Sequence, residues 1–474
     1  MEIKKVEKNN ASGETSCDAR SLVIVSLGDS YSSGEGIEPY CNQGAAKRYT
    51  DLDFLAHRSK KSWPGRLTLP GVCGTMADHR NENWFFAAAS GAKAKHILAS
   101  QSKTARARIS RSPDSIPKYR VYPTQQLAPQ LDIFKSLGDK KADYVTLTLG
   151  GNDAGFSDVI TRAIVGHTYI GISFLKLKLA SLWRSFYEPG GIRDSLLTAY
   201  LRIAEAAGPQ AQIIVAGYPR LFSPNGSRTL FSKQAVSIMN GAISDLNNHI
   251  EYLVDMLRAR GVAIHFVSVE KGFEAHEAYT SDSDDPFVRS RIEFIHRVSF
   301  GAGENDIDAG KAAYAGSLHP NFLGSEVYRI CVQKKIDELE KMRCNMGPSE
   351  VSAQSAPLPS TGSPFRASSL DDDTSFFWAE SAPDREVITT PALIEAPVSN
   401  GEQGGKSIKL PHIIGGAAAL ITVGALVGTA AARKMRALRS TFDTGLGGKI
   451  GSGSGEQPDP HECANELLEK PKKE

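Results

Sequence analysis

The 474-residue chain has few cysteines, little net charge and no long apolar run near its start. Its six cysteines are widely spaced, and none forms the Cys-x-x-Cys pair that is typical of structural metal sites. The formal net charge is +2 and the sequence indicates no clustered basic face, which argues against nucleic acid as the main partner. The first apolar run, residues 22–27, is too short for the apolar region of a signal peptide. The sequence therefore shows no sign of a metal centre, a nucleic-acid surface or a recognisable export signal.

Composition divides the chain into five predicted segments. Residues 21–345 have an ordinary globular make-up and are long enough to bury a large core. Residues 346–411 are rich in Ser, Pro, Ala and acidic side chains, so we expect a disordered stalk. Residues 412–432 are the predicted transmembrane helix. Residues 1–20 and 433–474 are predicted to be a disordered N-terminal segment and a disordered basic and polar tail.

The predicted span, residues 413–432, is twenty residues of Ile, Leu, Val, Ala, Gly and Thr without a charge. A helix of that length is about 30 Å long, which matches the hydrocarbon core of a bilayer. A buried Ala- and Gly-rich helix is the alternative. Basic residues follow the span more densely than they precede it, which favours a cytoplasmic tail and a folded domain on the exoplasmic side. Gly424-x-x-x-Gly428 predicts a weak homodimer through this helix.

Residues 22–27 form a short apolar run that stops at Gly28-Asp29-Ser30. Six residues rich in Val, Ile and Leu before a turn signal predict a buried parallel strand. Ser30 would then lie at the carboxyl edge of a sheet, where open α/β sheets bind ligands. Such a serine can be a nucleophile, or the stretch can be a simple strand followed by a capped helix.

Further motifs also stand at the ends of predicted elements. Residues 144–149 form a strand-like run before Gly150-Gly151-Asn152-Asp153, and His319 precedes the last helical pattern of the folded domain. Strands are also predicted at residues 83–88, 211–216 and 262–269, with helical patterns between them. This alternation predicts a three-layer α/β/α sandwich around a doubly wound, mainly parallel, five-stranded sheet.

The ordered motifs Gly-Asp-Ser, Gly-Gly-Asn-Asp and His-Pro resemble those of the SGNH (GDSL-type) hydrolases. The longer opening Gly-Asp-Ser-Tyr-Ser-Ser-Gly is most similar to that of the secreted bacterial lipases and esterases. The resemblance implies that Ser30 is the nucleophile and His319 the base. It also implies an oxyanion hole formed by the backbone N–H groups of Ser30 and Gly91 and the side chain of Asn152. No metal or organic cofactor is implied.

The sequence departs from the family pattern at the acid of the triad. The family usually has Asp three residues before the histidine, where this chain has Gly316. We therefore predict a Ser-His dyad whose histidine is held by a main-chain carbonyl, most simply that of Gly316. Asp306 and Asp308 are the alternative acids if the preceding loop folds back.

The sequence also lacks the family's cysteines before Arg58-Ser59 and before Ser90-Gly91, where it has Ala56 and Ala89. Both halves of that implied disulfide are absent together. Cys41 and Cys73 can form another pair or remain free. In the same region we interpret Arg58 as a structural pairing group and His57 as a surface imidazole.

Residues 158–191 form an unusually apolar insertion with interleaved lysines. It is either a lid that shelters an acyl chain or touches lipid, or a helix that covers the core. The sequence as a whole predicts a membrane-anchored serine esterase or lipase that acts on a lipid, a small acyl ester or an acetylated glycan. A membrane-anchored binding or scaffold protein that keeps the fold without turnover is the alternative.

Overall fold

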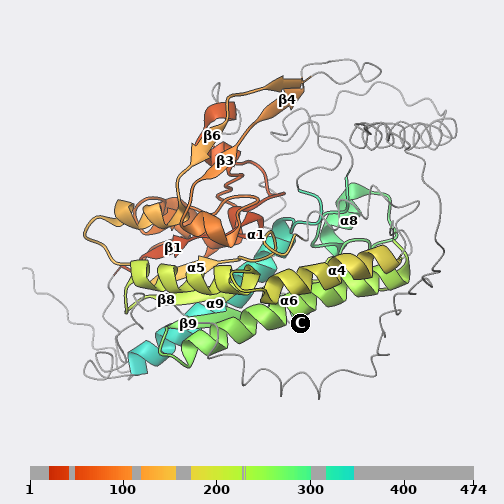
Figure 1. Cartoon of the computed structure of the whole chain (residues 1–474). Helices are drawn as coiled ribbons and strands as arrows, with labels where there is room; N and C mark the ends of the chain where they lie inside the picture. The colour runs from red at the N-terminus through yellow and green to blue at the C-terminus, as the bar shows by residue number, and fades with distance from the viewer. Residues whose placement is uncertain are drawn as a thin grey trace, which may run out of the picture. The chain divides into compact units, whose positions relative to one another are not determined.

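A computed structural model gives the fold of the part of the chain that can be described (Figure 1). The described residues are 21–41, 48–108, 119–155, 172–226, 229, 231–299 and 316–345. All of them belong to one unit, Met1–Ser381. The predicted N-terminal segment, stalk, membrane span and tail lie outside the described residues. Within the described residues, no helix is both long enough and apolar enough to cross a bilayer.

Five parallel strands form the central sheet. They are β1 (Ile24–Ser26), β2 (Trp84–Phe86), β7 (Tyr144–Leu147), β8 (Gln212–Ala216) and β9 (Ile264–Val267), in the order β2-β1-β7-β8-β9. In the middle of β1, Val25 pairs with Phe85 on one side and Val145 on the other. Because β1 is buried throughout, a short continuous apolar run suits it better than an alternating one. The predicted five-stranded α/β sheet is confirmed.

The chain reverses its direction of travel across the sheet at β1. It first crosses to β2 on one side, and it then returns to β7 and continues to β8 and β9 on the other side. In doubly wound sheets such a switch point opens a crevice at the carboxyl ends of the strands. The topology therefore places a ligand site at the ends of β1, β2 and β7.

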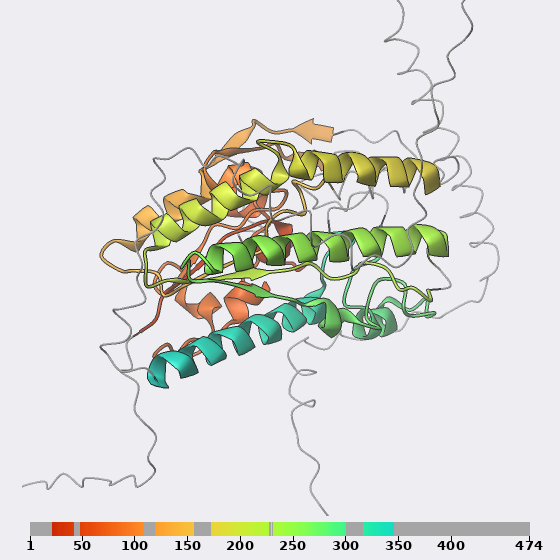
Figure 2. The ribbon, with the colours of Figure 1, turned by 60° about the horizontal axis from the view of Figure 1, so that its bottom comes forward.

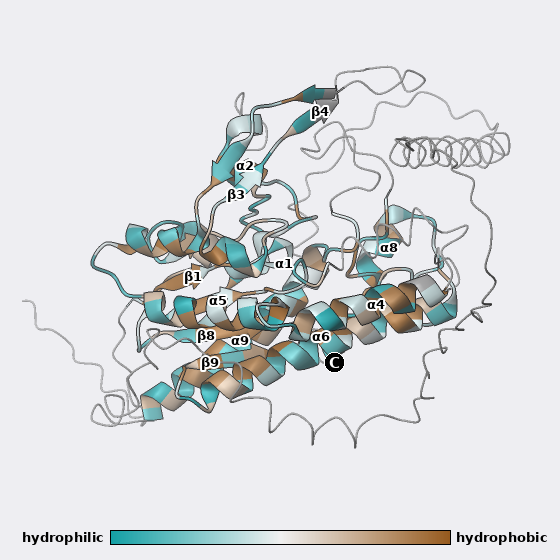
Figure 3. Cartoon of the chain, viewed as in Figure 1, coloured by the Kyte–Doolittle hydropathy of each residue, from teal (hydrophilic) through white to brown (hydrophobic). Residues whose placement is uncertain are grey.

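Helices cover both faces of the sheet, as Figure 2 shows for α5 and α6 on one side and α9 on the other. Their bounds are α1 (Ser30–Ser33), α2 (Leu52–Leu55), α4 (Ile172–Tyr187), α5 (Ile192–Ala207), α6 (Lys233–Arg258), α7 (Glu270–Phe273), α8 (Pro286–Ile292) and α9 (Phe322–Asn345). Buried residues of α9 recur every three or four positions, at Tyr328, Val332, Ile336 and Leu339. This spacing puts one apolar stripe against the sheet and leaves polar residues outside, as the mixed colours of the long helices in Figure 3 illustrate.

Short 3₁₀ helices and two antiparallel ribbons connect the layers. The 3₁₀ helices are η1 (Arg48–Thr50), η2 (Trp63–Arg66), η3 (Met76–His79), η4 (Ala94–Ile97) and η5 (Gln130–Leu137). The ribbons pair β3 (Gln101–Lys103) with β6 (Gln125–Leu127), and β4 (Arg106–Arg108) with β5 (Tyr119–Val121). The basic, Ser-rich composition of residues 101–120 suggests a surface loop and the pattern from residue 124 suggests a helix, but β3 to β6 occupy described residues of both stretches instead. Cross-strand backbone bonds form these ribbons without the apolar alternation that marks a strand.

The described part of the apolar insertion is α4, which contacts α5 and α6. Leu175, Leu179, Leu182 and Phe186 of this helix are buried in the main core. Of the two interpretations of the insertion, a helix that covers the core agrees with this packing. Residues 158–171 of the insertion lie outside the described residues.

Cys41 and Cys73 do not form a disulfide, so that alternative is wrong. The Cys41 thiol instead accepts a hydrogen bond from the Arg80 guanidinium at 2.9 Å, and Cys73 is exposed. Cys344 at the end of α9 is disulfide-bonded. The alanines that replace the family's cysteines, Ala56 and Ala89, are buried in one small apolar cluster. Their packing agrees with the joint loss of one bridge.

Candidate active site

The tight turn after β1 positions Ser30. Gly28 has a φ of +112°, and a Cβ there would lie 2.4 Å from the Thr148 carbonyl oxygen, so only glycine fits. The buried Gln130 side chain holds the backbone of the same residue, accepting from the Gly28 N–H at 2.7 Å and donating to the Gly28 carbonyl at 2.8 Å. Asp29 then caps the one-turn helix α1 by accepting from the Tyr31 N–H. Ser30 consequently begins α1 at the carboxyl edge of the sheet, as predicted.

Ser30 and His319 are brought into direct contact by this fold. The His319 Nε2 atom lies 2.8 Å from the Ser30 Oγ atom. The other ring nitrogen, Nδ1, lies 3.1 Å from the Ser317 carbonyl oxygen. Because a carbonyl can only accept, Nδ1 carries the proton and Nε2 is left to accept from the serine hydroxyl. The carbonyl is that of Ser317, so the expectation of Gly316 is wrong: the Gly316 carbonyl accepts from the His319 backbone N–H instead.

The loop that carries His319 is held from two sides. The Tyr31 hydroxyl donates to the Leu318 carbonyl at 2.8 Å, and the Tyr31 ring packs on the His319 ring at 4.9 Å between centroids. His296 exchanges backbone hydrogen bonds with the loop, accepting from Leu318 and donating to His319, both at 2.9 Å. These contacts keep Leu318 at a φ of +61°, a left-handed conformation that costs a leucine about 1 to 2 kcal/mol. A strained residue next to the histidine indicates that the loop is held in one conformation.

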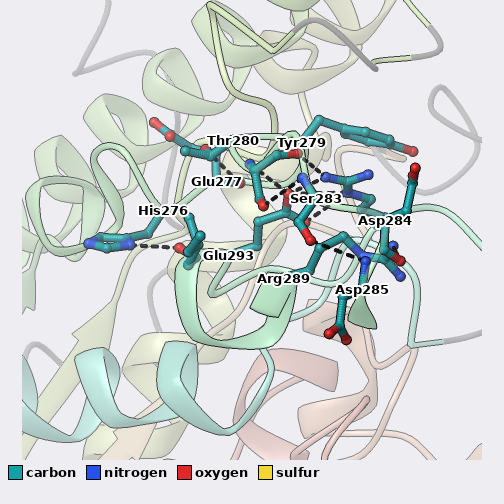
Figure 4. A network of polar contacts seen from close by, with 12 residues as sticks. His276, Glu277, Tyr279, Thr280, Ser283, Asp284, Asp285, Arg289 and Glu293 are labelled. Atoms are coloured by element: carbon teal, nitrogen blue, oxygen red, sulfur yellow. Dashed lines mark hydrogen bonds and ion pairs between the residues drawn. The ribbon is translucent and has the colours of Figure 1, made fainter. Parts of the chain in front are cut away.

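A polar network within residues 276–297, drawn in Figure 4, supports the segment that pairs with this loop. The Glu293 carboxylate accepts from the Ser281 N–H at 2.9 Å and is paired with Arg297. The His276 ring donates to the Ile292 carbonyl at 2.7 Å. These contacts fix residues 292–296, and an antiparallel bridge then joins Ile295 to Pro320, next to the histidine. Asp306 and Asp308, the alternative acids, lie outside the described residues.

The segments that contain Gly91 and Asn152 are tied to each other. The Asn152 side-chain amide donates to the Ala92 carbonyl at 3.0 Å. Both oxygens of the Asp153 carboxylate accept from the Ala94 N–H, at 3.1 and 3.0 Å. Asp153 thus holds the turn after β7 to the start of η4. The Ala89 N–H donates to the Gly28 carbonyl at 3.0 Å, so the same assembly reaches the nucleophile turn.

Glu35 and His57 form a buried pair that sequence reasoning missed. His57 Nδ1 contacts the Glu35 carboxylate, and the Tyr40 hydroxyl donates to the same carboxylate at 3.0 Å. His57 is 2% exposed and its ring stacks on the Tyr40 ring, so the expectation of a surface imidazole is wrong. Arg58 does have the predicted structural role, because it contacts the Asp53 carboxylate and two carbonyls after β2. A buried polar pair such as Glu35 and His57 leaves no apolar pattern in the sequence.

Burial and charge shift the pKa values of the site in opposite directions. Burial lowers the pKa of His319 below its ordinary 6.5, although the Glu35 carboxylate opposes this effect. Burial raises the pKa of Asp29 to about 6 against the hydrogen bonds that it accepts from Thr148 and Tyr218. The pKa of Asp153 is likewise raised by burial to about 6. His319 is therefore neutral near pH 7, the protonation state that a general base requires.

A serine hydroxyl that donates to a neutral, carbonyl-oriented histidine at the carboxyl edge of a parallel sheet is the arrangement of a serine hydrolase. Among the described residues, no group of His, Cys, Asp and Glu side chains is arranged to hold a metal ion.

Two Streptomyces lipases are similar to the chain in sequence. The lipase of Streptomyces rimosus is 28% identical over 258 residues, which cover 53% of this chain and 72% of that protein. Lipase 1 of Streptomyces coelicolor is 25% identical over 288 residues, which cover 61% and 82% respectively. No family model matches the chain. Together with the three motifs, these relatives confirm the predicted resemblance to the SGNH-type hydrolases, and the class that they support is that of the carboxylic ester hydrolases.

Solved structures of Streptomyces enzymes are also similar. An extracellular lipase from Streptomyces rimosus has a TM-score of 0.43 at 23% identity and covers 66% of this chain and 99% of its own. Phospholipase A1 from Streptomyces albidoflavus NA297 has a TM-score of 0.44 at 21% identity and covers 67% and 100% respectively.

Proposed function

We propose that the chain is a membrane-anchored serine esterase or lipase that hydrolyses carboxylic esters through a Ser30–His319 dyad. The observation that carries this proposal is the 2.8 Å contact between the His319 Nε2 and Ser30 Oγ atoms. The 3.1 Å contact between His319 Nδ1 and the Ser317 carbonyl supports it, because it selects the tautomer in which Nε2 is a base. A main-chain carbonyl would thus replace the carboxylate that position 316 lacks.

In this mechanism His319 Nε2 takes the proton of the Ser30 hydroxyl while Oγ forms a bond to the acyl carbon. The oxyanion of the tetrahedral intermediate accepts from the backbone N–H groups of Ser30 and Gly91 and from the side chain of Asn152. His319 then gives its proton to the departing alcohol, leaving an acyl-enzyme. Water attacks that acyl group, its proton passes to His319, and the acid leaves as the proton returns to Ser30. An amide suits position 152 because it donates without titrating.

The direct test is hydrolysis of p-nitrophenyl esters of increasing acyl length by the full-length chain in detergent. We expect Ser30→Ala and His319→Ala to abolish turnover above the uncatalysed rate. Asn152→Ala should lower kcat about 10²- to 10³-fold, the usual loss for one oxyanion donor. Wild-type turnover in Ser30→Ala would refute the mechanism. No turnover of any acyl length by the wild type would favour the alternative, a binding or scaffold protein with this fold.

We further propose that residues 413–432 anchor the enzyme to a lipid bilayer as a single-pass helix. Support comes from the twenty uncharged residues of this stretch and the basic residues that follow it. The catalytic domain, residues 21–345, would stand on the exoplasmic side at the end of the stalk. Carbonate extraction of membranes should retain the chain, and deletion of 413–432 should release it. If a weak homodimer forms through Gly424 and Gly428, Gly428→Ile should lower the yield of crosslinked dimer in membranes.

A further inference from the structure

Tyr218 stands at the end of β8, the neighbour of the strand that leads to Asn152. It is 5% exposed, and the buried Asn247 of α6 holds its backbone. The Asn247 side chain accepts from the Tyr218 N–H at 2.8 Å and donates to the Tyr218 carbonyl at 2.7 Å. The Tyr218 ring also meets the edge of the Tyr31 ring at 5.2 Å between centroids. The place of its hydroxyl is therefore fixed by the fold.

That hydroxyl joins the two turns of the proposed active site. It lies 2.5 Å from the Asp29 carboxylate, and the Gly151 N–H donates to it at 3.0 Å. Asp29 directly precedes Ser30, and Gly151 directly precedes Asn152. The Tyr218 hydroxyl thus connects the residue before Ser30 to the residue before Asn152.

Chemistry fixes the direction of these hydrogen bonds. The other oxygen of the Asp29 carboxylate already accepts from the Thr148 hydroxyl at 2.6 Å and from the Tyr31 N–H at 3.0 Å. An ionised carboxylate can only accept, so the Tyr218 hydroxyl donates its proton to Asp29. Its lone pairs then face the Gly151 N–H. Hydrogen bonds to a charged acceptor are the strong ones, which makes this link stiff.

The residue at position 151 allows this close approach. A Cβ on Gly151 would lie 3.1 Å from two carbons of the Tyr218 ring and 3.3 Å from its hydroxyl oxygen. Beyond Gly151 the chain turns at once, since the Ala154 N–H donates to the Gly150 carbonyl at 2.9 Å. The Tyr218 hydroxyl therefore holds the start of the turn that carries Asn152.

We propose that Tyr218 is a positioning residue that aligns the Asn152 amide with Ser30 through the Asp29–Tyr218–Gly151 link. This inference rests on the proposed function, in which Asn152 stabilises the oxyanion. Without the phenol oxygen the turn loses this anchor to β8, while its contacts to Ala92 and Ala94 remain. An oxyanion donor works over a narrow range, about 2.7 to 3.1 Å, so a small shift of the turn weakens it in the transition state.

The test is a double-mutant cycle on the full-length chain in which Tyr218→Phe is combined with Asn152→Ala. Alone, Tyr218→Phe should lower kcat about tenfold and leave KM within twofold. In the Asn152→Ala background it should cost less than twofold, because the amide that it positions is gone. Tyr200→Phe is the matched control: Tyr200 is fully buried in α5, and its hydroxyl has no hydrogen-bond partner among the described residues. Its kcat should equal that of the wild type.

The role of Tyr218 would be overturned if the kcat losses of Tyr218→Phe and Asn152→Ala multiplied in the double variant, or if Tyr200→Phe lowered kcat as much as Tyr218→Phe does. Either result would leave the proposed dyad intact. An Asn152→Ala enzyme with wild-type kcat would instead refute the oxyanion assignment, and this inference with it. Asp29→Asn probes the same link from its other end, should Tyr218→Phe fail to fold. Asp29→Asn should lower kcat when it is the only substitution and should change kcat less than twofold when Asn152→Ala is already present. If the two substitutions instead lower kcat independently, so that their fold-losses multiply, the proposal is again overturned.

Discussion

Replacing Asp29 by Asn should change how the stability of the fold depends on pH. Asp29 is 1% exposed, and burial raises its pKa from 3.8 to about 6 in the folded state. A raised folded pKa means that the protonated carboxyl stabilises the fold. That stability is complete below about pH 3.8 and is lost as pH rises through about 6. The total loss is about 3 kcal/mol, of which about 1.4 kcal/mol falls between pH 5 and pH 8.

An Asn at position 29 keeps the helix cap but does not ionise, so the variant does not lose stability between pH 5 and pH 8 as the wild type does. We expect the free energy of unfolding of Asp29→Asn, relative to wild type, to rise by about 1.4 kcal/mol between pH 5 and pH 8 in urea titrations. Asp53→Asn is the control, because charges of Arg58 and Arg80 outweigh burial and lower the Asp53 pKa. The Asp53 carboxyl titrates below pH 5, so Asp53→Asn should change the free energy of unfolding by the same amount at pH 5 and at pH 8. If the difference in free energy of unfolding between Asp29→Asn and wild type were the same at pH 5 and pH 8, the reasoning would be refuted.

Two further predictions concern the surroundings of Ser30 and His319. Gln130→Leu should lower the free energy of unfolding by about 2 to 4 kcal/mol in urea, because it leaves the buried Gly28 N–H without its acceptor. Gln126→Leu removes an exposed side chain that, among the described residues, bonds to Ser102 alone, so it should cost under about 1 kcal/mol; equal losses would contradict the argument. If a main-chain carbonyl orients His319, Asp306→Asn and Asp308→Asn should each keep ester hydrolysis within about tenfold of wild type. A thousandfold loss in a folded variant would show that a carboxylate completes a triad.

The sheet could be predicted from sequence because its strands are apolar and end at turn signals. The apolar runs 22–27 and 144–149 indicate strands, although β1 and β7 are shorter than the runs, and the motifs that follow parallel strands meet at one edge of the sheet. The ribbon of Gln101–Lys103 with Gln125–Leu127 gave no such signal. It is polar and partly exposed, and the pairing that makes it a ribbon joins residues far apart in the chain.

The partners of the site residues were harder to predict than their identities. Ser317 and Gly316 both offer a carbonyl, and only the backbone path of a loop decides which one faces His319 Nδ1. Tyr218 follows a strand in a Gly-Tyr-Pro sequence that indicates a turn, and nothing local shows that its hydroxyl reaches Asp29. Contacts of this kind depend on the packing of neighbouring strands, which a single sequence does not contain.

The contact between Ser30 and His319 joins residues that are 289 positions apart. A ribosome adding about 5 to 20 residues per second makes Ser30 roughly 15 to 60 seconds before His319. Throughout that interval the serine is an ordinary hydroxyl, because the imidazole that would activate it has not been synthesised. Helix α9, which packs on β8 and β9, follows the histidine directly. Under the proposed mechanism, a growing chain therefore gains activity against the esters around it only after His319 and the helix that follows it have been made.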